Sequence, residues 1–175
     1  TYVAYSNYDI VNDVEHINNP LIRETLKYFN IFQHIELITF NDIPSRTGLG
    51  GSSSFCVSLI HSIYKLLNKT LDINTIIDQA IDIERNVLKE NVGLQDQIAC
   101  SYGGLNLIKF NNNDFKVSKL NIEKNILDSL NNNLILCYSG IQRISNDISK
   151  KYIKKLSTSS YQDLMNTNYD LVKEG

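Results

Sequence analysis

The stretch Pro44-Ser45-Arg46-Thr47-Gly48-Leu49-Gly50-Gly51-Ser52-Ser53-Ser54 decides how this chain is interpreted. An alternating run at 34–40 leads into it, and an apolar run with helical spacing at 55–67 follows it. The glycines lack Cβ, so the backbone there can turn sharply and approach a ligand closely. The serines stand where a helix should begin, and the first N–H groups of a helix have no partner inside it. Such a turn predicts an anion site, most often a phosphate site.

The residues of this stretch bear on three other interpretations. A plain strand-to-helix turn, in which a serine only caps the helix, has the same sequence and stays open. A Walker A loop is excluded because it ends in Gly-Lys-Ser/Thr, and no lysine is present here. A hydrolase nucleophile elbow reads Gly-x-Ser-x-Gly, and Ser54 occupies the place of its last glycine.

The composition bounds the class of protein. The chain has 175 residues, of which 42% are hydrophobic, enough for one substantial core. A net charge of -2, with both signs interspersed, gives no basis for a nucleic-acid or membrane partner, and no apolar run is long enough to span a bilayer. Cys56, Cys100 and Cys137 lie far apart in apolar segments, which predicts reduced, buried thiols in a cytoplasmic protein.

Periodicity predicts helices interleaved with strands. The expected helices lie at 20–31 (capped by Asn19), 55–67, 73–88 (capped by Asp72), around Asp96, and at 122–130, 146–155 and 161–173. The expected strands lie at 2–5, 34–40, 105–110, 115–120 and 134–138, and the third and fourth of these form a hairpin. A hairpin among interleaved elements indicates a mixed fold of helices and strands rather than a doubly wound sheet.

Two acidic residues follow the loop, Glu84 near the end of a predicted helix and Asp96 between Gly93 and the pair Gly103-Gly104. Phosphoryl transfer needs a metal, positioning and charge neutralisation more than covalent chemistry. One carboxylate can hold Mg²⁺ beside the phosphates, and a second can accept the proton of the acceptor hydroxyl. Spacing alone fits a surface ion pair for Glu84 and a helix-start carboxylate for Asp96 equally well.

The loop resembles a known family. Pro44-x-x-x-Gly48-Leu49-Gly50-x-Ser52-Ser53 is similar to the central nucleotide loop of the GHMP kinases, the superfamily of galactokinase, homoserine kinase and mevalonate kinase. The later order of Glu84, Asp96 and a Gly-Gly pair matches that family too. The resemblance implies an α+β fold, that of the GHMP-kinase N-terminal domain, with a mixed sheet packed with helices and apparently truncated at both ends.

The resemblance also implies ATP and Mg²⁺ as cofactors and assigns roles to residues. Asp96 would be the catalytic base, and Ser52 and Glu84 would hold the metal. The nucleotide would be bound by Pro44, Gly48, Leu49, Gly50, Gly51, Ser52 and Ser53. Gly51 departs from the family, which usually has a serine there, so the backbone cradle is kept but one hydroxyl is lost.

A narrower resemblance concerns the substrate. Glu84-Arg85, the segment Asn91-Val-Gly-Leu-Gln-Asp96-Gln and Tyr102-Gly-Gly-Leu-Asn look like the branch that phosphorylates the anomeric hydroxyl of D-glycero-D-manno-heptose 7-phosphate. Fucokinase- or galactokinase-like sugar kinases and a non-catalytic nucleotide-binding module are the alternatives. Ser139-Gly140-Ile141-Gln142-Arg143 resembles a Thr/Ser-Gly-x-x-Arg segment of that branch, in which Arg143 would bind the phosphate of the sugar. A surface charge at a helix start is the other interpretation of Arg143.

The resemblance covers only the middle of the family's chain. We therefore expect residues 1–145 to form an incomplete nucleotide- and substrate-binding domain, and 146–175 to be the helical start of the family's C-terminal domain. The expected partners are ATP and a small sugar phosphate, and the expected state is a monomer or homodimer. Alone, this chain is expected to bind nucleotide weakly and to turn over little or nothing.

Overall fold

The computed structural model describes residues 1–5, 7–32, 34–42, 47–111, 114–141, 149, 153, 155–156 and 158–174. Three sequence predictions lie wholly or largely outside these ranges. They concern Pro44 in the loop, Arg143, and most of the helix expected at 146–155.

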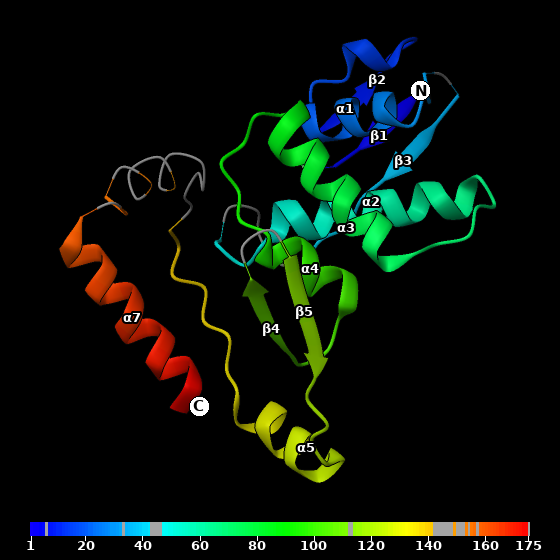
Figure 1. Cartoon of the computed structure of the whole chain (residues 1–175). Helices are drawn as coiled ribbons and strands as arrows, with labels where there is room; N and C mark the ends of the chain where they lie inside the picture. Colours follow the sequence, from blue (N-terminus) through cyan, green and yellow to red (C-terminus); the bar gives the residue numbers. More distant parts are fainter. Residues whose placement is uncertain are drawn as a thin grey trace.

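Helices and two small sheets make up the described part of the chain (Figure 1). The strands are β1 (Tyr2–Ala4), β2 (Tyr8–Ile10), β3 (Glu36–Ile38), β4 (Asn106–Asn111) and β5 (Asp114–Lys119). The helices are the 3-10 helix η1 (Val14–His16), α1 (Pro20–Tyr28), α2 (Gly51–Leu66), α3 (Ile73–Asp82), the π-helix η2 (Ile83–Val87), α4 (Gln95–Tyr102), α5 (Lys124–Asn133) and α7 (Ser159–Glu174).

The two sheets are separate and differ in kind. The first has the order β2-β1-β3, with β1 antiparallel to β2 and parallel to β3. It is therefore a mixed sheet, as the resemblance implies. The second sheet is the antiparallel hairpin β4-β5, in which Asn106 pairs with Lys119, and this confirms the predicted hairpin.

The helix α2 lies at the centre of the core. Leu59 and Ile63 on one side of it pack with residues of β1, η1 and α1, and Cys56 and Ile60 pack with residues of α1, α3 and η2. These positions recur every three or four residues, as the buried face of a helix requires. Because α2 is anchored on both sides, its first turn, which carries the serines of the loop, has a fixed position.

The helix starts predicted from capping residues are confirmed. The side chain of Asn19 accepts hydrogen bonds from the backbone N–H groups of Leu21 and Ile22, with Pro20 as the first residue of α1. Asp72 caps α3 in the same way through the N–H group of Thr75. These caps fix where α1 and α3 begin, and with them the register of the buried faces.

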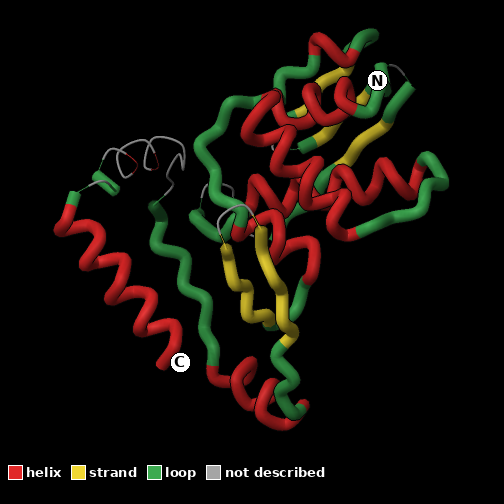
Figure 2. Tube along the Cα trace, in the orientation of Figure 1, coloured by secondary structure: helices red, strands yellow, loops and turns green. Residues whose placement is uncertain are grey.

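Of the three cysteines predicted to be buried, Cys56 is buried, but Cys100 and Cys137 are exposed. The prediction of a buried strand at 134–138 is also wrong. This segment has no strand partner among the described residues, and the side chain of Ile135 is 86% exposed. A run of β-forming residues becomes a strand only when its backbone groups pair with a neighbour. Figures 1 and 2 show that α5, this segment and α7 lead away from the packed helices α1–α4. Within the described ranges, no helix has both the length and the apolarity needed to cross a bilayer.

Candidate functional site

The glycine-rich loop reaches α2 through two residues with left-handed backbone. Gly48 has φ +82° and Gly50, the residue just before α2, has φ +69°. Side chains other than glycine are strained in this region. Ser52 and Ser53 lie inside the first turn, and in the described part of the chain no side chain caps this helix start. The capping role left open for the serines is therefore not observed, and the helix start keeps N–H groups without intrahelical partners.

Glu84 lies at the end of α3, where the helix continues as the π-helix η2. Single π-turns are rare irregularities that often mark functional sites. The Glu84 side chain is 0% exposed, and the hydroxyl of Ser53 lies 3.1 Å from its Oε1 and 2.9 Å from its Oε2. The surface ion pair considered for Glu84 is excluded by this burial. The hydroxyl of Ser53 thus contacts both oxygens of the Glu84 carboxylate.

The electrostatics of Glu84 are those of a carboxylate removed from water. Burial raises its pKa above the usual value, and the nearby negative charge of Asp96 adds to this rise. Hydrogen bonds from Gln97, Ser53 and Ser52 lower the pKa without cancelling the effect of burial. Ser52 is exposed. Its hydroxyl nevertheless lies close enough to the Glu84 carboxylate to lower the pKa of that group.

Asp96 lies in the first turn of α4 and is exposed. Its carboxylate approaches the glycine loop so closely that a Cβ atom added to Gly50 would lie 3.1 Å from its Oδ2. The structure thus brings Asp96, Gly50, Ser52, Ser53 and Glu84 together around the first turn of α2, from three elements far apart in sequence. Leu49 and Gly51 are exposed beside them.

Gln97 is the site residue that sequence reasoning missed. It is 1% exposed, and its Nε2 donates hydrogen bonds to Glu84 Oε2 and, at 3.2 Å, to Ser53 Oγ. A glutamine has no special chemistry that would single it out. The available signal was its place directly after Asp96 on a helix, beside the buried Ile98.

The loop between η2 and α4 is held by Arg85. Both Nε and Nη2 of its guanidinium donate to the backbone carbonyl of Val92, at 2.9 and 2.8 Å. Arg85 adjoins Glu84 and Val92 precedes the first turn of α4. This contact therefore fixes the distance between the segments that carry Glu84 and Asp96.

The donor set fits Mg²⁺, a hard cation that prefers oxygen ligands and is usually held in nucleotide sites by one or two carboxylates with phosphate oxygens and water. Glu84 and the hydroxyl of Ser52 supply such oxygens. Among the described residues no group of three or more His, Cys, Asp and Glu side chains could hold a metal unaided. A cation here would therefore complete its coordination with the nucleotide and water.

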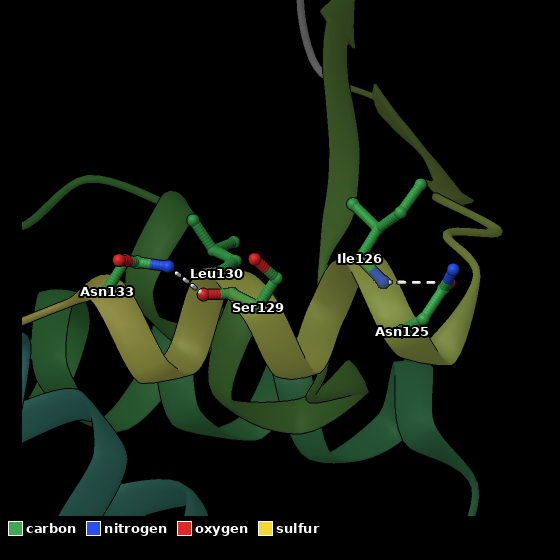
Figure 3. Close-up of a pocket in the computed structure, with 5 residues that line it drawn as sticks. All are labelled: Asn125, Ile126, Ser129, Leu130 and Asn133. Atoms are coloured by element: carbon green, nitrogen blue, oxygen red, sulfur yellow. Dashed lines mark hydrogen bonds between the residues drawn. The ribbon is translucent and has the colours of Figure 1, made fainter.

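A hollow on α5 is a separate feature (Figure 3). Its lining comes from one face of this helix, and is formed by Asn125, Ile126, Ser129, Leu130 and Asn133. The Nδ2 of Asn133 donates to the carbonyl of Ser129 at 2.7 Å, so this polar group is already paired within the helix. The lining of this hollow contains no charged side chain.

The glycine at position 50 gives the first prediction. Gly50→Ala should lower the free energy of unfolding by about 1–3 kcal/mol, because alanine is strained at this positive φ and its Cβ presses on Asp96. Gly51→Ala is the matched control, since no atom lies within 4 Å of its added Cβ, and it should leave stability unchanged or slightly higher. Urea unfolding of the full-length variants measures both. Equal stability of the two variants would contradict the described geometry of the loop.

Comparison with known proteins identifies the family of this chain. Residues 16–104 match the family described as GHMP kinases N terminal domain. The chain is also 35% identical over 130 residues to the D-glycero-alpha-D-manno-heptose 7-phosphate kinase of Campylobacter jejuni subsp. jejuni serotype O:2, a match that covers 74% of this chain and 38% of that protein. The chain therefore belongs to the GHMP kinase family.

Two solved structures share the fold. A D-glycero-D-manno-heptose 1-phosphate kinase from Bacteroides thetaiotaomicron superposes with a TM-score of 0.62 at 24% identity, covering 74% of this chain and 46% of that one. A Campylobacter jejuni protein described as a sugar kinase superposes with a TM-score of 0.59 at 30% identity, covering 73% and 45%. The chain thus spans less than half the length of each of these relatives. The predicted α+β fold of the GHMP N-terminal domain is confirmed.

Proposed function

We propose that the protein to which this chain belongs is an ATP-dependent sugar-phosphate kinase that phosphorylates the anomeric hydroxyl of D-glycero-D-manno-heptose 7-phosphate. The observation that carries the proposal is the convergence of Ser52, Ser53, Glu84 and Asp96 on the first turn of α2. The 35% identity to a Campylobacter jejuni heptose 7-phosphate kinase supports this choice of substrate.

The phosphates of ATP would lie against the loop that contains Pro44, Gly48, Leu49, Gly50 and Gly51. The free N–H groups at the start of α2 and the positive end of its dipole favour a polyanion there. The left-handed Gly50 allows the backbone to come close, since no Cβ stands in the way.

Glu84 and Ser52 would hold Mg²⁺, and bound Mg²⁺ would neutralise charge on the phosphates during transfer. Glu84 is held in a water-poor interior by Ser53 and Gln97, where its charge acts with little screening. Because Ser53 contacts both carboxylate oxygens, its hydroxyl would have to release one of them to a cation.

Asp96 would act as the general base. The anomeric oxygen forms a bond to the γ-phosphorus of ATP, the bond from that phosphorus to the β–γ bridging oxygen breaks, and ADP leaves. The proton of the anomeric hydroxyl passes to the Asp96 carboxylate. The exposure of Asp96 beside Gly50 leaves it accessible to an acceptor sugar. Arg143 would bind the 7-phosphate through its guanidinium.

The test is an acceptor screen with the full-length protein, ATP and Mg²⁺. Consumption of ATP with D-glycero-D-manno-heptose 7-phosphate, and a product with phosphate on carbons 1 and 7 by ³¹P NMR, is the expected result. Turnover of fucose or galactose instead would place the protein in another sugar-kinase branch. Binding of ATP without turnover of any of these acceptors would favour a non-catalytic nucleotide-binding module.

A further inference from the structure

Three buried polar side chains from three elements form a closed ring of hydrogen bonds. Ser53 comes from α2, Glu84 from η2 and Gln97 from α4, and their exposed fractions are 4%, 0% and 1%. Ser53 Oγ donates to the Glu84 carboxylate at 2.9 Å, and Gln97 Nε2 lies within hydrogen-bond distance of both Glu84 Oε2 and Ser53 Oγ. The ring therefore connects the first turn of α2 to the segments that carry Glu84 and Asp96.

The chemistry of the ring fixes the orientation of the Gln97 amide. In the structure the NH₂ group of Gln97, and not its carbonyl, faces Glu84, and this orientation suits the ionised carboxylate that a cation needs, because such a carboxylate only accepts hydrogen bonds. The two N–H groups of Nε2 match its two neighbours in the ring, Glu84 Oε2 and Ser53 Oγ. Rotating the amide by half a turn would place its carbonyl oxygen against a negative charge.

This arrangement leaves the Gln97 carbonyl oxygen buried and without a hydrogen-bond partner among the described residues. An unpaired buried polar atom destabilises the folded state, because it has lost its hydrogen bonds to water. An apolar side chain of the same size would avoid that cost. A residue that violates a packing rule in this way commonly serves a site rather than stability.

We propose that Gln97 is a positioning residue, which orients the Glu84 carboxylate for the divalent cation that accompanies the nucleotide. The inference rests on the proposed function, in which Glu84 binds that cation. Side chains that orient a metal ligand typically contribute 10–100-fold to metal affinity. Because Gln97 directly follows Asp96 on α4, it also keeps the two acidic groups in a fixed relation.

The experiment measures the dissociation constant of a non-hydrolysable ATP analogue for the full-length protein, once with Mg²⁺ and once with EDTA. The ratio of the two constants reports how strongly the cation supports nucleotide binding. Gln97→Met keeps the size of the side chain and removes both donors, so the ratio should fall about tenfold while affinity in EDTA stays the same. Gln95→Met, an exposed glutamine on the same helix, is the matched control and should not change the ratio.

Glu84→Gln tests the metal site of the proposed function, and Gln97→Met tests the positioning role of Gln97. If Glu84→Gln leaves the ratio unchanged, Glu84 does not bind the cation and the proposed metal site fails. If Glu84→Gln lowers the ratio but Gln97→Met does not, the positioning role alone is overturned. Should Gln97→Met fail to fold, as judged by circular dichroism, Gln97→Asn replaces it. Asn keeps the amide but retracts it by one methylene, and the same fall in the ratio is expected.

Discussion

Asp96→Asn is expected to reduce kcat of the full-length protein by about 10²–10⁴-fold, the contribution that a positioned general base typically makes. Asparagine has nearly the shape of aspartate, so the side chain fits the same space beside Gly50 and the start of α4 should not be displaced. The amide cannot accept the proton of the sugar hydroxyl. Because Asp96 is not expected to hold the nucleotide, the affinity for ATP should stay within a factor of about two to three.

Steady-state phosphorylation of heptose 7-phosphate and equilibrium binding of an ATP analogue measure these two quantities. Asp78→Asn is the matched control, since Asp78 is an exposed acid on α3 without a role in the site. A variant Asp96→Asn that turns over at the wild-type rate would remove Asp96 from the reaction. Loss of ATP binding together with turnover would assign Asp96 to the nucleotide instead.

Glu84→Gln should lower the activity of the protein without lowering its stability. Removing the charge that is proposed to hold the cation is expected to lower kcat by about 10²–10³-fold at a fixed Mg²⁺ concentration, a loss of several kcal/mol in transition-state stabilisation. Burial, however, raises the pKa of Glu84, so the ionised carboxylate is disfavoured in the folded protein. Without Mg²⁺ at neutral pH, the free energy of unfolding of Glu84→Gln should therefore be equal to that of the wild type or higher.

The raised pKa of Glu84 should also make the free energy of unfolding depend on pH. Between the ordinary pKa of a glutamate and the raised value in the fold, the folded state binds more protons than the unfolded state. Wild-type stability measured in EDTA should therefore fall as the pH rises through this interval, and Glu84→Gln should lose this component. Denaturant unfolding at several pH values measures it, with the exposed Glu123→Gln as control. A less stable Glu84→Gln at neutral pH would contradict the view of Glu84 as a costly, functional charge.

Features set by neighbouring residues could be predicted from the sequence. Asn19 and Asp72 cap helices because their side chains reach N–H groups two or three residues ahead, and the hairpin β4-β5 pairs two adjacent alternating runs. Features set by distant contacts could not. The run at 134–138 has the composition of a strand, but whether it pairs depends on a partner elsewhere, and in the described structure it has none.

The candidate site also combines features that the sequence predicted with features that depend on distant contacts. The resemblance drew attention to Glu84 and Asp96, and the structure places both beside the first turn of α2. The π-turn at Glu84, however, adds one residue to a helical turn and leaves no periodic trace in the sequence. The direct contact of Glu84 with Ser53 and the buried amide of Gln97 follow from how three helices pack, and no local pattern reports that packing.

A crystal structure of the full-length protein with Mg²⁺ and a non-hydrolysable ATP analogue tests the arrangement most directly. We expect the analogue's phosphates against the N–H groups at the start of α2, the cation bound to the Glu84 carboxylate, and Asp96 facing the terminal phosphate. Phosphates bound away from α2, with Glu84 still enclosed by Ser53 and Gln97 and no cation on it, would contradict the account.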